Sequence, residues 1–223
     1  MKILYVIQTC DNYFFSRCES TINTWLKKIN SESDYVFLSA NPVSEKVVGY
    51  GTGDGYFSLP EKWLHFLNNY ELESFDWVIA VDDDLFCFPD RLENFIEENN
   101  FSPDELIVIG NRSCYFSEIN DDILCGGGGI LFSKLTIKEI KKFISESTEP
   151  TRYLCGDCNF FYWCKELNVK IINASVNGIL DNEKFIHFYY KNNHIVASEL
   201  DKTITLHYCT NEDKYEIYKQ FYE

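Results

Sequence analysis

The sequence predicts a single α/β domain with a mostly parallel central sheet, and three observations favour this fold. Short apolar runs that are typical of strands alternate along the chain with amphipathic runs that are typical of helices. The length of 223 residues suits one domain. The composition is 45% hydrophobic and 17% aromatic, which is ample for a sizeable core.

Strands are expected where short runs are rich in valine, isoleucine and aromatic residues. These runs are Lys2–Gln8, Asp34–Ser39, Phe75–Val81, Leu106–Gly110, Ile130–Phe132, Val169–Ile172 and Thr203–His207. Helices are expected where apolar residues recur at helical spacing. These segments are residues 16–29, 60–70, 89–98, 134–146, 157–167 and 211–221. The glycine-rich segment 40–58 is expected to be a long loop near the functional site.

The chain is acidic, with a formal net charge of −15 and a pI near 4.7. This argues against nucleic-acid partners, because sequence-independent binding of DNA or RNA needs clustered Lys and Arg. It also argues against anionic membrane surfaces. Met1 runs directly into a strand-like segment without the apolar core of a signal peptide, and no stretch approaches the roughly 18 apolar residues of a membrane span. We therefore expect a cytoplasmic protein without a membrane span.

Nine cysteines are an odd and fairly high number. Without a secretion signal, we expect mostly free, reduced thiols. Cys155 and Cys158 have C-x-x-C spacing, but no second pair completes a zinc site.

Three consecutive aspartates, Asp82, Asp83 and Asp84, close the apolar run Phe75–Val81. They cannot all be buried without compensation, because an unpaired buried charge is very costly. In open α/β sheets, ligands bind outside the carboxyl ends of the strands, and a hard divalent cation that bridges carboxylates to a phosphate fits this position. The alternative is a solvated turn between strand and helix with an aspartate as N-cap.

Two further motifs lie in the second half of the chain. Four glycines, Gly126–Gly129, precede a strand-like run; they form either a tight turn or a flat floor under a sugar-like ligand. Asp157 begins an aromatic helical stretch, where it is either an N-cap or a general base. Of the histidines, His187 is our candidate to complete a metal site beside the aspartates, and His207 is its rival.

In this order, the motifs resemble the catalytic domain of the Fringe and core-1 β1,3-galactosyltransferase group of inverting glycosyltransferases. The resemblance covers roughly Lys2 to Cys209. The matching segments are Ile7–Cys10, Arg17, Thr24–Trp25, Asp34–Ser39, Trp77–Leu92, Ile109–Gly110, Cys125–Gly129, Cys155–Cys158, Ile186–His187, Ser198–Leu200 and Ile204–Leu206. The chain departs from the family where Gly156 replaces a usual acidic residue and where the usual membrane anchor and stem are absent, so we do not assume the family's disulfides.

The resemblance implies a GT-A type fold in one catalytic domain over residues 1–223, with a nucleotide-binding half at about 1–110 and an acceptor half at about 111–223. It implies metal-dependent, inverting transfer of a hexose from a UDP-sugar, with Mn²⁺ or Mg²⁺ as cofactor. The acceptor would be a hydroxyl of a glycan, glycolipid or glycoprotein, and the linkage would be β1,3.

The resemblance also implies roles for individual residues. Asp84 and His187 would hold the metal directly, with Asp82 in support. Asp83 would face the ribose or the sugar. Thr9 and Arg17 would contact UDP. A glycine floor that includes Gly127 and Gly128 would lie under the donor and the acceptor. Asp157 would be the base that takes the acceptor proton.

Two other functions are compatible with these residues. One is a non-catalytic carbohydrate-binding relative, which the loss of one acidic residue beside Asp157 favours. The other is a phosphoryl transferase or hydrolase that uses the aspartate cluster, although the sequence has no recognisable phosphate-binding motif.

Overall fold

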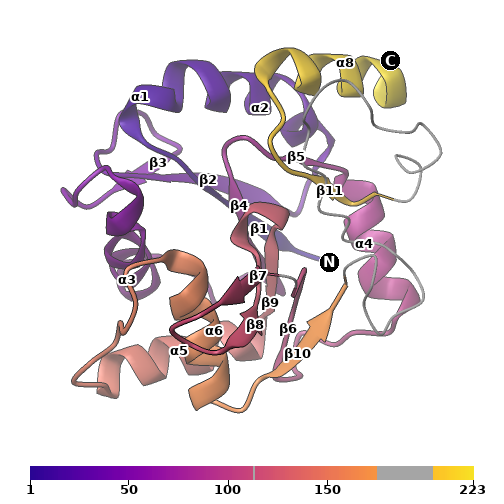
Figure 1. Cartoon of the computed structure of the whole chain (residues 1–223). Helices are drawn as coiled ribbons and strands as arrows, with labels where there is room; N and C mark the ends of the chain where they lie inside the picture. The colour runs from indigo at the N-terminus through magenta and orange to yellow at the C-terminus, as the bar shows by residue number, and fades with distance from the viewer. Residues whose placement is uncertain (113, 175–202) are drawn as a thin grey trace.

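A seven-stranded sheet forms the centre of the molecule (Figure 1). The computed structural model describes residues 1–112, 114–174 and 203–223. The strands lie in the order β10 (Lys170–Asn173), β6 (Ile107–Gly110), β9 (Ile130–Ser133), β4 (Trp77–Asp82), β1 (Ile3–Gln8), β2 (Asp34–Ser39) and β3 (Val47–Gly49).

One strand of this sheet runs against the others. β9 pairs antiparallel with β4 and β6, whereas the pairs β1–β4, β1–β2, β2–β3 and β6–β10 are parallel. The carboxyl ends of β1 and β4 therefore lie at one edge, where Gln8 is in register with Asp82. Because β9 is reversed, the residues that precede it reach this same edge.

Helices cover both faces of the sheet. The side chains of β1 are apolar on each face, and both faces are therefore buried under helices. Ile3, Tyr5 and Ile7 belong to one core cluster, and Leu4 and Val6 belong to the other. The first cluster includes residues of the 3₁₀ turn Trp25–Lys28, of α4 (Pro89–Glu98) and of α8 (Asn211–Tyr222). The second includes residues of α3 (Leu59–Asn69), α5 (Lys134–Glu146) and α6 (Gly156–Glu166).

The local sequence accounts for several helix ends. Pro89 opens α4, where its missing N–H is not needed. Ser133 caps α5 by accepting a hydrogen bond from the Thr136 N–H. Thr210 and Asp213 form a complete capping box at the start of α8.

The short elements lie around the edge of the sheet that carries the aspartates. They are α1 (Asp11–Tyr13), the π-helical turn Phe14–Cys18, α2 (Glu19–Asn23), the 3₁₀ turns Tyr56–Ser58 and Gly126–Gly128, the pair β5 (Phe86–Cys87) and β11 (Thr205–Leu206), and the hairpin β7 (Cys114–Phe116) and β8 (Asp121–Ile123).

The structure corrects three of the expected elements and adds one that was not expected. The predicted helix at 16–29 is broken into π, α and 3₁₀ turns, and the predicted strand Thr203–His207 shrinks to β11, which pairs with β5 outside the main sheet. The predicted loop 40–58 contains β3, whose backbone packs so closely on Asn41 that a side chain at Gly49 would clash. The hairpin β7–β8 was not predicted.

The expectation of mostly free thiols is wrong for four cysteines. The structure has disulfides between Cys114 and Cys125 and between Cys155 and Cys158. The hairpin and the first turn of α6 bring the Cα atoms of these pairs to 5.6 and 5.5 Å. The other five cysteines are free: Cys10, Cys18, Cys87, Cys164 and Cys209.

The described part of the chain contains no helix that is both long and apolar enough to cross a membrane.

Candidate active site

The triple aspartate forms a turn at the carboxyl end of β4. Asp82 ends the strand, and the Leu85 N–H donates to the Asp82 carbonyl to close the turn. The side chain of Gln8 links this turn to the core: its Nε2 donates to Asp82 Oδ1 at 2.8 Å, and its Oε1 accepts from Trp63 Nε1 at 2.6 Å. The orientation of Asp82 is thus fixed by a buried chain of hydrogen bonds.

Asp83 points toward the end of β1 and is 5% exposed. Thr9 Oγ1 donates to its Oδ2 at 2.7 Å, and Arg17 Nη1 donates to its Oδ1 at 2.9 Å. Arg17 also lies 3.5 Å from Asp84 Oδ2 and stacks over the ring of Tyr13. Burial raises the pKa of Asp83, and the hydrogen bonds from Thr9 and Arg17 oppose this rise.

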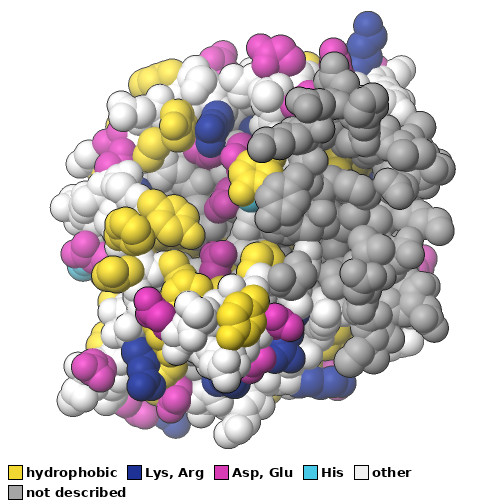
Figure 2. Space-filling view, viewed as in Figure 1, with side chains coloured by type: hydrophobic (Ala, Val, Ile, Leu, Met, Phe, Trp, Pro, Cys, Tyr) yellow, Lys and Arg dark blue, Asp and Glu magenta, His cyan; other side chains and the backbone are white. Residues whose placement is uncertain are grey.

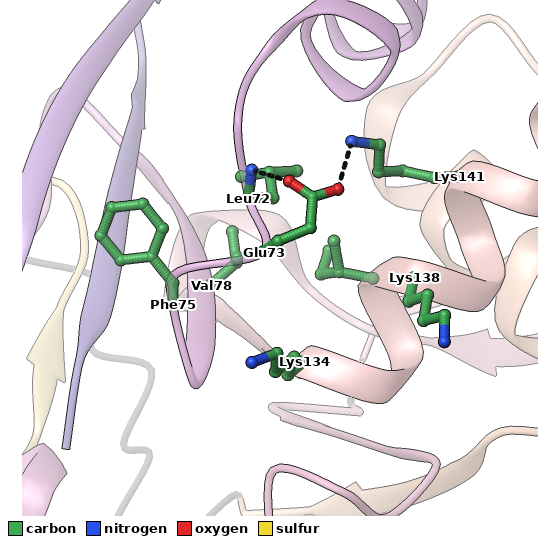
Figure 3. Close-up of a pocket in the computed structure, with 8 residues that line it drawn as sticks. Leu72, Glu73, Phe75, Val78, Lys134, Lys138 and Lys141 are labelled. Atoms are coloured by element: carbon green, nitrogen blue, oxygen red, sulfur yellow. Dashed lines mark hydrogen bonds and ion pairs between the residues drawn. The ribbon is translucent and has the colours of Figure 1, made fainter.

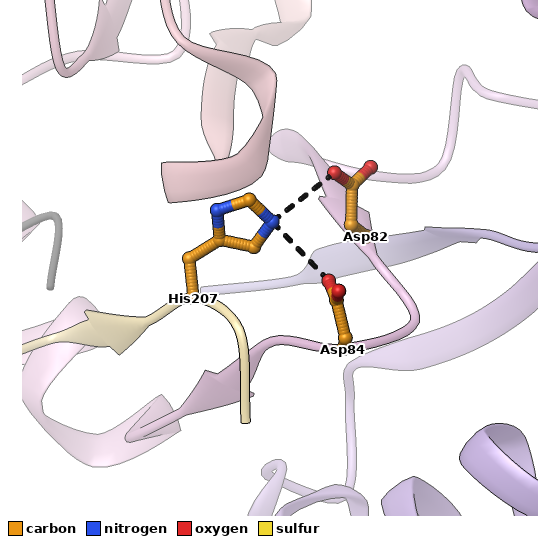
Figure 4. Close-up of side chains that lie close together, drawn as sticks. All are labelled: Asp82, Asp84 and His207. Atoms are coloured by element: carbon orange, nitrogen blue, oxygen red, sulfur yellow. Dashed lines mark ion pairs between the residues drawn. The ribbon is translucent and has the colours of Figure 1, made fainter. Parts of the chain in front are cut away.

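His207 completes a cluster with Asp82 and Asp84 (Figure 4). Its Nε2 lies 3.2 Å from Asp84 Oδ1 and 3.6 Å from Asp82 Oδ2. The strand pair β5–β11 and a hydrogen bond from the Cys209 N–H to the Asp84 carbonyl bring His207 to the aspartates. The ring of Tyr208 stacks on the imidazole with centroids 3.7 Å apart.

The three side chains fit a divalent cation. Each offers a ligand atom, and these atoms lie within 4.8 Å of one another. Two carboxylates and one imidazole suit Mn²⁺, and carboxylate oxygens suit Mg²⁺. The geometry thus assembles a donor set of the expected chemistry, with His207 in the place for which the sequence suggested His187. His187 lies outside the described residues.

The charges of the cluster are unequal. Burial, followed by repulsion from Asp157, raises the pKa of Asp82 to about 7, although about a third of its side chain is exposed. Burial also acts to raise the pKa of Asp84, but the hydrogen bond and charge of His207 outweigh it, so that this pKa is lowered. Asp84 is therefore ionised at neutral pH, while the carboxyl of Asp82 is poised between its two forms.

The glycine segment lies against the cluster, and two of its members are needed for close approach. A Cβ at Gly126 would overlap the carboxylate of Asp157, and a Cβ at Gly127 would overlap the ring of His207. Thr205 Oγ1 donates to the Gly128 carbonyl at 2.6 Å and ties the segment to β11. Side chains at these positions would push apart the residues that the fold brings together.

Asp157 lies in the first turn of α6, across the glycine segment from His207. Its Oδ2 accepts a hydrogen bond from the Gly126 N–H at 2.9 Å. Burial raises its pKa, which the Gly126 N–H and the nearby His207 oppose. The helix cap at this end is made by Cys155, whose Sγ accepts from the Cys158 N–H. The expected N-cap alternative for Asp157 is therefore not what the structure shows.

Lys214 is a component of the site that the sequence did not predict. It projects from α8 and is fully buried. Its ammonium donates to the carbonyls of Arg17 and Asp83 and to the hydroxyl of Thr21. Burial lowers its pKa to about 8, and the nearby charge of Asp83 opposes this. No sequence motif marks this lysine, because its role depends on the docking of the last helix.

A cleft opens in front of the triple aspartate. Its walls come from the end of β1, from α1 and the π-helical turn, from α3 and the segment before it, and from the aspartate turn. The lining residues are Gln8, Thr9, Cys10, Tyr13, Arg17, Asp54, Gly55, Tyr56, Leu59, Lys62, Asp82, Asp83 and Asp84. Figure 2 shows acidic side chains in a hollow of this face, with hydrophobic side chains around it. The segment 40–58 contributes Asp54, Gly55 and Tyr56, so it lies at the site as expected.

A second cavity of about 170 Å³ lies near the opposite end of β4 (Figure 3). Leu72, Phe75 and Val78 line it together with one side of α5, and Lys141 pairs with Glu73 at 3.3 Å. This cavity is apolar and lies away from the aspartates, so it is not part of the acidic cleft.

The structure thus gathers most of the predicted site residues at one edge of the sheet. Three of them, Thr9, Arg17 and Asp83, form a hydrogen-bonded group beside the cleft. The others gather around His207: Asp82, Asp84, Gly127, Gly128 and Asp157. The sequence did not predict roles for Gln8 and Tyr208, or for Lys214. Gln8 and Tyr208 lie next to recognised motifs, but only their contacts in the structure show that they belong to the site.

Comparison with known proteins places this site in context. A sequence model of the family described as Fringe-like matches residues 1–219. Chondroitin sulfate synthase 3 of Mus musculus is 24% identical over 163 residues, and that of Homo sapiens is 24% identical over 168 residues. Each match covers 64% of this chain but 18% of the synthase, so the chain spans less than a fifth of the length of these relatives.

Solved structures resemble the chain over nearly its whole length. A glycosyltransferase involved in the glycosylation of the major capsid of PBCV-1 matches with a TM-score of 0.56 and 12% identity, over 98% of this chain and 100% of that chain. The galactosyltransferase LgtC, solved with donor and acceptor sugar analogues, matches with a TM-score of 0.50 and 13% identity, over 100% and 97%. At such identities the likeness establishes a shared fold.

Proposed function

Because this chain belongs to the Fringe-like family and has the GT-A fold of glycosyltransferases, as predicted, we propose that it is a metal-dependent, inverting enzyme that transfers a hexose from a UDP-sugar. Membership of the family and the fold support transfer of a sugar. The metal, the donor, the β1,3 linkage and the acceptor class, a glycan, glycolipid or glycoprotein, belong to the proposal.

One observation carries the proposal: the cluster of Asp82, Asp84 and His207 faces Asp157 across the glycine segment. A divalent cation bound by the cluster would supply positive charge for the diphosphate that leaves the sugar. Lys214 keeps the aspartate turn in place from behind, through the Asp83 carbonyl. Binding of the leaving group and removal of a proton are thus served by different side chains.

Thr9 and Arg17 are positioned to bind the nucleotide. Both line the cleft, and Arg17 carries a positive charge beside the carboxylates of Asp83 and Asp84. Asp83 holds both side chains in place, and the guanidinium group has further N–H donors for a diphosphate oxygen. Asp83 itself would accept a hydrogen bond from the ribose or the sugar.

Asp157 is the proposed base. As the acceptor hydroxyl attacks the anomeric carbon, its proton passes to the Asp157 carboxylate, and the bond from that carbon to the diphosphate oxygen breaks with its electron pair on UDP. The Gly126 N–H occupies one site on Oδ2, and a carboxylate has about four such sites. Its raised pKa makes it a better proton acceptor than an ordinary aspartate, which has a pKa of about 3.9.

Tyr56 extends the site toward the acceptor. Its side chain is exposed, lines the cleft and lies close enough to Asp157 and Asp82 to feel their charges. Partial loss of water around the phenol, followed by these charges, raises its pKa to about 12, so that it stays a hydrogen-bond donor. An aromatic ring with a polar tip suits contact with one face of a sugar.

A screen of UDP-sugars tests the proposal. The full chain is incubated with each donor and Mn²⁺ or Mg²⁺, and release of UDP is measured with and without EDTA. Metal-dependent release from one donor supports the enzyme. Binding of UDP-sugars without any turnover points to a carbohydrate-binding relative, and release of phosphate from other phosphoesters points to a hydrolase; both results contradict the proposal.

A further inference from the structure

The contact between Gly126 and Asp157 is bracketed by both disulfides. Cys125 directly precedes Gly126, and its disulfide partner is Cys114 of β7. On the other side, Cys155 and Cys158 flank Asp157 and close the first turn of α6. Each end of this hydrogen bond is therefore one or two residues from a covalent cross-link.

One side of α6 is anchored in the second main cluster through Phe160, Trp163 and Cys164, whereas the side that faces the hairpin has only a small hydrophobic cluster. The hairpin β7–β8 and one side of α6 pack around a separate cluster with three buried residues: Ile123, Cys158 and Phe161. The two main clusters contain 27 and 22 buried residues among those that the structure describes. Small cores of this kind stabilise a conformation weakly, and disulfides commonly compensate.

Neither disulfide joins the hairpin to α6, and the ion pairs between these two elements are weak. Asp121 of β8 pairs with Lys165 of α6 at 2.9 Å and with Arg112 at 2.9 Å, but these side chains are about a third to a half exposed. Exposed ion pairs contribute little because water screens them. The covalent cross-links act locally on each end of the contact: Cys114–Cys125 ties the residue before Gly126 to the hairpin, and Cys155–Cys158 closes the turn that carries Asp157.

We propose that the disulfides Cys114–Cys125 and Cys155–Cys158 are positioning elements for the catalytic base, which hold Asp157 against the Gly126 N–H. The inference rests on the proposed role of Asp157. Breaking either disulfide loosens the base side of the site and leaves the cluster of Asp82, Asp84 and His207 in place, because that cluster is built on β4 and β11.

The chemistry of reduction follows from exposure. Cys114 and Cys155 are partly exposed, whereas Cys125 and Cys158 are buried. The thiolate of an added dithiol attacks the accessible sulfur of Cys155, the S–S bond breaks, and Cys158 leaves as a thiolate that takes up a proton. The second thiol of the reagent then displaces Cys155, so that the protein gains two thiols and the reagent becomes a disulfide. The same sequence applies at Cys114 and Cys125.

The experiment compares the full chain with two double variants, Cys114→Ala/Cys125→Ala and Cys155→Ala/Cys158→Ala. Three quantities are measured: the Kd for UDP with Mn²⁺ by calorimetry, kcat at saturating donor, and hydrogen exchange at the Gly126 amide. Cys164→Ala is the matched control, because Cys164 lies on α6 and carries a free thiol. Where a variant folds poorly, the reduced wild-type protein replaces it. This sample is treated with dithiothreitol and desalted before Mn²⁺ is added.

We expect kcat to fall by about 10- to 100-fold in each double variant and in the reduced protein, because small misplacements of catalytic groups cost this much. The Kd for UDP should stay at the wild-type value, the Gly126 amide should exchange faster, and the Cys164→Ala protein should match the wild type. Unchanged kcat and unchanged exchange at Gly126 overturn the inference, as does a parallel loss of UDP binding.

Failure of the proposed function is a separate outcome. If the wild type transfers no sugar from any donor, the assignment of Asp157 as base falls. Exchange at Gly126 in the oxidised and reduced protein then still decides whether the disulfides hold the contact with Asp157.

Discussion

The two sides of the cleft are built in different ways. The side that we propose to bind the metal and the nucleotide grows out of β1 and β4, whose residues Ile3–Ile7 and Trp77–Val81 are buried in the central sheet. The base side lies outside the sheet, where a glycine turn meets the start of α6 around a small cluster with two disulfides. The first side is held by the central sheet, whereas the second combines the packing of α6 on the second main cluster with local restraints, so we expect changes near the disulfides to affect mainly the second side.

The largest expected effect separates the two sides directly. Asp157→Asn should lower kcat by about 10²- to 10⁴-fold, because it removes the proton acceptor from the base side. The affinity for UDP with Mn²⁺ should stay close to the wild-type value, since those contacts lie on the other side. Steady-state kinetics at saturating donor and calorimetry check both parts. Transfer at the wild-type rate would show that Asp157 is structural and would direct the search to Asp121, Asp122 or Asp181.

Lys214 tests whether the metal side depends on the core. Lys214→Met leaves two carbonyls and one hydroxyl without their buried donor, so we expect a loss of about 3 kcal/mol in the free energy of unfolding. Lys219→Met is the matched control on the exposed side of the same helix, with an expected change within about 0.5 kcal/mol. Urea denaturation measures both variants. Equal stability of the two proteins would mean that the buried ammonium does not anchor the aspartate turn.

Substitution of a proposed metal ligand should have the reverse effect of Asp157→Asn: it should weaken UDP binding and leave the contact of Asp157 intact. Asp84→Asn should weaken Mn²⁺-dependent UDP binding by at least about 10- to 100-fold, because it removes an ionised ligand, while the disulfides and the Gly126–Asp157 contact remain. His207→Ala and His187→Ala are measured alongside by calorimetry. A loss with His207→Ala and none with His187→Ala assigns the third ligand to His207. The reverse result would remove His207 from the cluster's function.

The smallest expected effect is that of pH on the affinity for Mn²⁺, and it depends on a residue from each side, Asp82 and Asp157. Burial and the charge of Asp157 raise the pKa of Asp82 to about 7, so a proton occupies this carboxyl below that pH and competes with the cation. We expect the affinity for Mn²⁺ to fall by about tenfold for each pH unit below 7. In the Asp157→Asn protein the repulsion is gone, so the midpoint should move to lower pH. Calorimetry between about pH 5.5 and 8.5 measures the affinity of both proteins for Mn²⁺. An affinity that does not change with pH would contradict the prediction.

The sequence predicted the central sheet well because its signals are local. The run before Asp82 is apolar and contains β-branched residues, and β4 forms there; the segment at Asp34–Ser39 and the helix at 134–146 have the predicted bounds. Period and composition decide such elements without knowledge of their neighbours. The division into a nucleotide-binding half and an acceptor half stays a prediction.

The remainder of the site depends on contacts between distant parts of the chain. The approach of His207 to Asp84 spans more than 120 positions and requires β11 to pair with β5, for which two-residue strands give no signal. The cysteine pairs were also hidden, because the spacing of Cys114 and Cys125 says nothing about a hairpin that the sequence did not reveal. Loop closure and tertiary packing set these features, and neither is periodic.

The reversed direction of β9 has a consequence for how this scaffold tolerates change. The segment 111–129 leaves the sheet at the end of β6 and returns to it at the start of β9, both at the edge that carries the site. It contains the hairpin and the glycine turn, yet no strand of the main sheet. Replacement of this one continuous segment would change the side of the site opposite Asp82 and Asp84 without removing any hydrogen-bonded pair of strands from the main sheet. This segment is therefore suited to replacement, provided that Gly126 and Gly127 are kept to leave room for Asp157 and His207, and that Cys114 and Cys125 are kept so that their disulfide forms.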